Sequence, residues 1–178
     1  MERFQNQNRM QMPSFYGVEG TIVEMRTADS AGMGNRTGCS MFVSVEDENG
    51  NIVNFIVSPS TYVADFITLR EGMEAVFYYR TDSPVPLIYP PQYSAAVVVP
   101  KQLLRGQSVT VGHFNDSLVN EEQTLQLHMD GSVQVLTTNN QRFLGSPGGR
   151  DLVVFYERST RSIPAQTTPE KIVVLCGR

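Results

Sequence analysis

Short runs of alternating apolar and polar residues follow one another along most of this chain, separated by Gly, Pro, Asn and Asp. Such alternation is typical of β-strands, in which neighbouring side chains point to opposite faces of a sheet. The separating residues favour turns. The pattern predicts strands over residues 15–25, 39–45, 52–57, 73–80, 94–99, 107–114, 124–129, 132–137, 152–158 and 171–176.

One segment carries helix signals instead. Ser58 is suited to cap a helix, Pro59 to its first position and Gly72 to its C-terminal end. Within residues 58–72 the apolar side chains fall on one helical face, namely Tyr62, Val63, Phe66 and Ile67. The sequence therefore predicts a short helix between the third and fourth strands.

A helix at that place in a five-stranded unit is the order of an OB-fold, a small Greek-key barrel. Residues 106–178 repeat the strand pattern, with the Gly- and Pro-rich segment 138–150 in place of the helix. We therefore predict an all-β protein, mainly antiparallel, with one short helix and two tandem OB-fold-like five-stranded barrels. The barrels span 15–100 and 106–178, and the short linker 101–105 requires them to pack together.

Two segments lie outside these barrels' strands and carry side chains suited to contacts. Residues 1–14 form a polar N-terminal arm rich in Gln, Asn and Met. Residues 81–93 form a loop stiffened by four prolines that also carries apolar and aromatic side chains. A stiff loop loses little entropy on docking, so both segments are candidate interfaces.

Composition and charge narrow the partners. The chain is 40% hydrophobic and 18% charged, and its net charge of −4 offers no global attraction to nucleic acid or anionic lipid. No apolar run approaches the roughly 20 residues that span a membrane. The N-terminus lacks the apolar region of a secretory signal. The compartment stays open between a cell or spore surface and the cytoplasm.

Catalytic residues are sparse. His113 and His128 are the only histidines and stand on separate strands, without the neighbours a metal site needs. The acidic run 46–51 is interpreted as turn chemistry, since a calcium loop requires more regularly spaced oxygen ligands. Cys39 and Cys176 are expected either as buried thiols or as a disulfide between the two halves. We expect no enzyme, no cofactor and no metal.

Two binding hypotheses follow. In the first, the arm and the Pro-rich loop mediate self-association, since tyrosine and arginine anchor interfaces; alternatively the loop's apolar residues fold back onto their own barrel. The interface residues would be Phe4, Met10, Met12, Pro84, Leu87, Ile88, Tyr89 and Tyr93. In the second, an OB face binds single-stranded nucleic acid or saccharide by stacking. Its residues would be Arg26, Arg36, Arg80, Tyr89 and Tyr93.

Several motifs are distinctive: PVPLIYPPQY (84–93), SIPAQTTP (162–169), IVVLC (172–176) and NFIVSP (54–59). Through them, residues 15–176 resemble small duplicated β-barrel proteins of anaerobic spore-forming Firmicutes. The composition of the arm is similar to that of spore-coat or cell-surface protein tails. The resemblance implies a structural protein of a spore or cell surface. Together with the candidate interfaces on the arm and the Pro-rich loop, we expect a non-enzymatic homo-oligomer or polymer, such as a surface layer, spore coat or fibre. The lack of a long apolar run predicts that it does not insert into a membrane.

Overall fold

A computed structural model of the chain describes residues 12–28 and 38–177. Between them these residues form short strands and two 3₁₀ turns, and no helix among them has the length and apolar character needed to cross a membrane. The strands are β1 (Phe15–Thr27), β2 (Met41–Glu46), β3 (Ile52–Val57), β4 (Tyr62–Val63), β5 (Glu74–Arg80), β6 (Gln92–Pro100), β7 (Ser108–Phe114), β8 (Leu125–Leu127), β9 (Gln134–Thr137), β10 (Arg150–Tyr156), β11 (Ala165–Thr167) and β12 (Lys171–Leu175). The 3₁₀ turns are η1 (Ala64–Phe66) and η2 (Lys101–Leu103). The predicted all-β class is confirmed.

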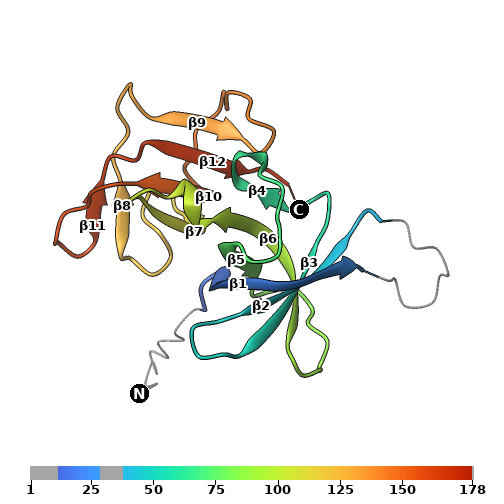
Figure 1. Cartoon of the computed structure of the whole chain (residues 1–178). Coiled ribbons are helices and arrows are strands. Elements are labelled where there is room, and N and C mark those ends of the chain that lie inside the picture. Colours follow the sequence, from blue (N-terminus) through green and yellow to red (C-terminus); the bar gives the residue numbers. More distant parts are fainter. Residues whose placement is uncertain (1–11, 29–37, 178) are drawn as a thin grey trace, which may run out of the picture.

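The first half is a closed five-stranded barrel (Figure 1). Going round it, β1 pairs with β2, β2 with β3, β3 with β6, β6 with β5, and β5 with β1. All of these pairings are antiparallel except that of β3 with β6, which closes the barrel in parallel with Phe55 opposite Tyr93. Large apolar side chains fill the interior, and the rings of Phe55 and Phe77 stack there at 4.9 Å between centroids.

Closure of the barrel depends on the long strand β1, which pairs with both β2 and β5. Its register shifts between Ile22 and Glu24, which bends the strand from one neighbour toward the other. At Gly20 the backbone passes so close to β2 that an added Cβ would meet the carbonyl oxygen of Glu46 and lie 2.7 Å from Cγ1 of Val45. Glycine is therefore required at this crossing.

The predicted helix over residues 58–72 is wrong. The segment forms a turn, the two-residue strand β4 and the 3₁₀ turn η1, in which Asp65 and Phe66 have positive φ angles of 53° and 54°. β4 pairs in parallel with Val97 and Val98 of β6. These pairings bury Tyr62 and Ala64 against the second half, and this burial outweighs the local helix signals.

The second half forms an open sheet. Its strand order is β7-β10-β12-β9, antiparallel except that β9 runs parallel to β12. Among the described residues β7 pairs along its length with β10 alone, and the short strands β8 and β11 form a separate parallel pair. Strand pairing among the described residues therefore does not close the second barrel that the sequence predicts. One face of the sheet carries a buried apolar cluster that includes Leu152 and Val154 of β10 and Ile172 and Val174 of β12.

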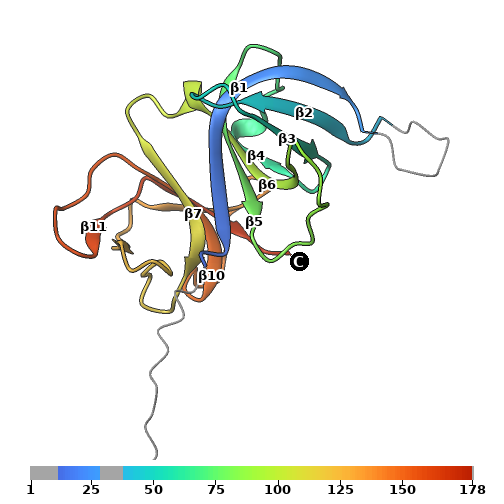
Figure 2. The ribbon, with the colours of Figure 1, turned by 90° about the horizontal axis from the view of Figure 1, so that it is seen from below.

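The two halves share a continuous core where they meet, and Figure 2 shows them side by side. Val97 and Val99 point outward from the barrel and pack with Val153, Phe155 and Val173 of the second sheet. Four of these five side chains are at most 1% exposed, so the junction is as fully buried as the core of each half. The halves consequently pack as one body, as the short linker predicts.

Candidate functional site

Three consecutive exposed apolar side chains lie in the loop between β5 and β6. We call residues 84–89 the loop tip. Leu87 is 103% exposed, Tyr89 88% and Ile88 54%. These side chains therefore point into solvent, and the alternative that they fold back onto their own barrel is wrong.

Tyr93 belongs to a different environment from the loop tip. Its ring stacks on that of Tyr79 at 3.8 Å and 8°, and lies 6.1 Å from the ring of Phe55. It is half-buried at one end of the barrel. The structure thus separates Tyr93 from Leu87, Ile88 and Tyr89, with which it is grouped by sequence.

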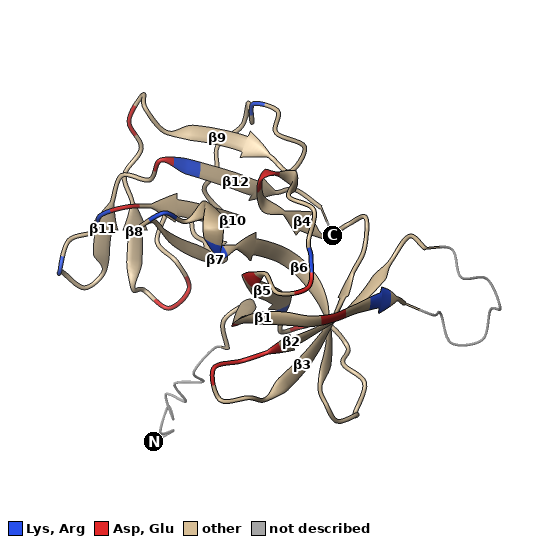
Figure 3. Ribbon diagram, viewed as in Figure 1, with Lys and Arg blue, Asp and Glu red and all other residues tan. Residues whose placement is uncertain are grey.

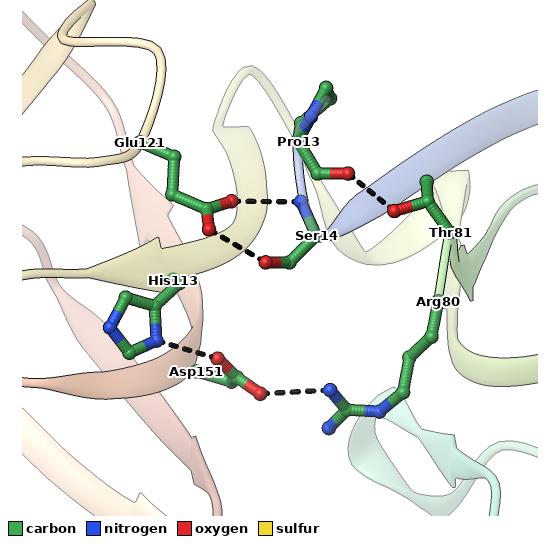
Figure 4. Close-up of polar contacts among 7 residues, drawn as sticks. All are labelled: Pro13, Ser14, Arg80, Thr81, His113, Glu121 and Asp151. Carbon is green, nitrogen blue, oxygen red and sulfur yellow. Dashed lines mark hydrogen bonds and ion pairs between the residues drawn. The ribbon is translucent and has the colours of Figure 1, made fainter. Parts of the chain in front are cut away.

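The base of the N-terminal arm is fixed beside the same loop (Figure 4). The Thr81 hydroxyl donates to the carbonyl of Pro13 at 2.6 Å, and the Thr81 amide donates to the carbonyl of Ser14 at 3.0 Å. On its other side, Ser14 donates from its amide and its hydroxyl to the carboxylate of Glu121, at 2.8 and 2.7 Å. Arm and loop therefore leave the body of the protein at adjacent points.

The interface residues predicted within the arm are placed only in part. Phe4 and Met10 lie outside the described residues. Met12 is 74% exposed, and Pro84 at the start of the loop tip is also exposed. Apart from Tyr93, the described residues of the predicted interface are therefore accessible.

Of the three arginines of the alternative ligand site, Arg26 and Arg80 are described, and neither is directed to the loop tip. Arg26 lies over the ring of Phe42, 3.9 Å from its centroid, and 3.7 Å from a carboxylate oxygen of Glu24. Arg36 lies outside the described residues. Arg80 turns away from the loop toward the second half. The contacts of Arg26 and Arg80 therefore do not support stacking on Tyr89 assisted by these two cations.

Arg80 instead belongs to a polar cluster at the junction of the two halves. Its Nη1 donates to Oδ2 of Asp151 at 2.9 Å, while Nδ1 of His113 lies 2.9 Å from Oδ1 of the same carboxylate. The side chains of Arg80 and Asp151 are 20% and 19% exposed. Figure 4 shows the three in a row that bridges β5, β10 and β7.

Two opposing effects act on Asp151. Burial alone would raise the pKa of its carboxyl group, but the hydrogen bonds with His113 and Arg80 and the Arg80 charge together lower the pKa below its ordinary value. Asp151 is thus an anion that holds two cation-capable side chains. Sequence reasoning missed it because the three residues are distant in the chain and only the register of β7 and β10 brings His113 beside it.

The remaining titratable candidates have structural surroundings. Nε2 of His128 lies 2.8 Å from Oε1 of Gln166. Asp47 accepts hydrogen bonds from the Asn51 and Asn49 amides, which lower its pKa, as expected of a turn-capping residue. Neither prediction for the cysteines holds, since Cys39 and Cys176 are both exposed and are not joined to each other. Across residues 12–28 and 38–177, no three His, Cys, Asp or Glu side chains are grouped to hold a metal ion.

No protein-family model matches this chain, and no curated protein matches it.

Proposed function

We propose that this protein is a non-enzymatic interaction module that self-associates through its loop tip and N-terminal arm. The observation that carries the proposal is the exposure of Leu87 and Tyr89 on a proline-bounded loop. Isolated exposed apolar residues are ordinary, but three in succession on a stiff loop form a patch suited to docking. A surface layer, spore coat or fibre is the kind of assembly we propose.

We propose that the two halves of the chain arose by duplication of one OB-type unit. In the barrel β1 pairs with β5, β5 with β6 and β6 with β3, and in the second half β7, β10, β12 and β9 follow in the same order with the same directions. The second unit is then an open copy whose edge strand β7 could receive an extended segment. A donated N-terminal arm would supply it by β-augmentation.

Energetics indicate why both contacts are needed. Burying each of Leu87, Ile88 and Tyr89 contributes about 2 kcal/mol, or about 6 kcal/mol together. Association costs at least about 4 kcal/mol in lost freedom of motion. The loop tip alone would therefore give weak association, and a second contact from the adjacent arm would strengthen it without any new loop surface.

The test is the size of the full chain in solution, measured by sedimentation over a range of concentrations. We expect concentration-dependent oligomers of the unaltered protein, and about a thousandfold weaker association for Leu87→Ser/Tyr89→Ser, because about 4 kcal/mol of burial is lost. Deleting residues 2–11 should weaken association separately while leaving Pro13 and Ser14 attached to Thr81 and Glu121.

The matched control is Ile163→Ser. Ile163 is 93% exposed on the loop between β10 and β11. This substitution therefore removes an exposed apolar side chain that is not part of the loop tip. We expect it to leave association unchanged. A chain that stays monomeric at all concentrations, or a control as damaging as the loop variant, would contradict the proposal.

A further inference from the structure

A cleft opens at one end of the barrel, between the beginning of β1, the turn between β2 and β3, and the beginning of β6. Its volume is about 700 Å³, within the range of ligand-binding clefts, about 300–1,000 Å³. None of residues 84–89 lines it, so it is separate from the loop tip.

Three tyrosines form one wall of this cleft. The rings of Tyr79 and Tyr93 are stacked, and that of Tyr16 lies 5.8 Å from Tyr79 at an angle of 51°. Tyr16 is 55% exposed, so part of its ring faces solvent. Burial, followed by the hydrogen bond with Tyr93, raises the pKa of Tyr79, so its phenol is neutral at physiological pH. The wall therefore offers aromatic rings, and the phenol of Tyr79 among them is neutral.

The rest of the lining is strongly acidic. It contains the carboxylates of Glu19, Glu46, Asp47, Glu48 and Glu74 and a single ammonium group, that of Lys101. Lys101 is itself engaged, with its Nζ 2.5 Å from Glu19 and 3.8 Å from Glu74. Among the described residues Glu46 and Glu48 have no cationic partner, and the turn that carries them is red in Figure 3.

We propose that this cleft binds a peptide segment of a partner protein that carries arginine or lysine. Aromatic faces attract such cations, and the attraction is strongest where carboxylates stand nearby. The same charges oppose a nucleic-acid backbone, which is an anion along its whole length. This inference goes beyond self-association, because the residues involved differ from those of the loop tip.

The probe is a fluorescein-labelled nonapeptide of alternating glycine and arginine, titrated with the full chain and followed by anisotropy at low salt. We expect saturable binding that weakens as salt is added, because screening shortens the reach of the carboxylates. Glu46→Gln/Glu48→Gln should weaken binding about tenfold. Tyr16→Ser should weaken it about threefold by removing the exposed ring.

Two controls separate a specific cleft from general acidity and from self-association. Glu122→Gln/Glu157→Gln removes the same charge from exposed positions in the second half and should leave the affinity unchanged. Leu87→Ser/Tyr89→Ser should bind the peptide as well as the unaltered chain, even if that variant no longer associates. Peptide binding that fails to saturate would overturn the proposal. So would an affinity of Glu122→Gln/Glu157→Gln as low as that of Glu46→Gln/Glu48→Gln, or tighter binding of an oligothymidine than of the peptide.

Discussion

The polar cluster at the junction gives the sharpest prediction, through the change Asp151→Ala. Exposed ion pairs contribute about 0–1 kcal/mol, and removing one partner of a fully buried pair costs about 3–5 kcal/mol. With about a fifth of each side chain exposed, the pair of Asp151 and Arg80 lies between these limits. We therefore expect a loss of about 2 kcal/mol in the free energy of unfolding.

That loss is measurable by thermal and urea unfolding. For a chain of this size about 2 kcal/mol corresponds to a fall in Tm of about 4–8 °C. The matched control is Glu19→Gln, which breaks the ion pair with Lys101 where the two side chains are 59% and 40% exposed. We expect the control to change stability by less than about 0.5 kcal/mol.

The double variant Arg80→Met/Asp151→Ala tests whether the two groups act together. If they do, its loss should be smaller than the sum of the single losses by about 1 kcal/mol, since no charge is left without its partner. Losses that simply add, or an Asp151→Ala protein as stable as the unaltered one, would refute the reasoning. The refutation would mean that the Asp151 cluster adds little to the contact between the halves.

The same cluster predicts a dependence on pH. The folded-state pKa of Asp151 lies below its unfolded value, which is near 4. Its contribution to stability is therefore complete above about pH 4 and is lost as the pH falls through the folded-state pKa. The difference in stability between the unaltered protein and Asp151→Asn should hold at neutral pH and shrink under more acidic conditions. A difference that is constant with pH would contradict this assignment.

Further predictions concern packing and buried hydrogen bonds. Gly20→Ala should destabilise the barrel by more than about 2 kcal/mol, since the added Cβ meets the β2 backbone, whereas Gly131→Ala, with open space around it, should be nearly neutral. Asn120→Ala should cost about 2–3 kcal/mol, because the Asn120 side chain, in a residue only 5% exposed, accepts from the amides of Thr124 and Leu125. Val153→Ala should cost about 2 kcal/mol at the shared core. Urea unfolding measures each loss; a Gly20→Ala protein as stable as the unaltered chain, or equal losses for the two glycine variants, would contradict the close crossing of β1 and β2.

Strand positions could be predicted from sequence because alternation is a local signal. Residues 52–57 form β3 with the predicted bounds, and all ten predicted strands have a counterpart. The helix was mispredicted because Ser58 and Gly72 give local signals that cannot register the pairing of β4 with β6. The same limit explains the Asp151 cluster and the tyrosine wall, which depend on pairings across the closed barrel and the junction.

Among the predicted site residues, the loop tip was recognisable because its apolar side chains stand between prolines, where no strand can bury them. The grouping of Tyr93 with Tyr89 failed, since four residues of separation change a loop position into a barrel position. The sequence predicts Arg80 at a ligand face because it stands beside the loop that flanks the binding face of an OB-fold. Its true partner lies 71 residues further along the chain.

The shared core has a consequence for how the molecule can be divided. The shared core is buried only while both halves are present; it contains Val97, Val99, Val153 and Phe155. A cut within residues 101–105 that separated the halves would therefore expose an apolar, aggregation-prone surface on each half. We therefore expect calorimetry to record one melting event for the whole chain. Either half, expressed by itself, should precipitate or remain unfolded.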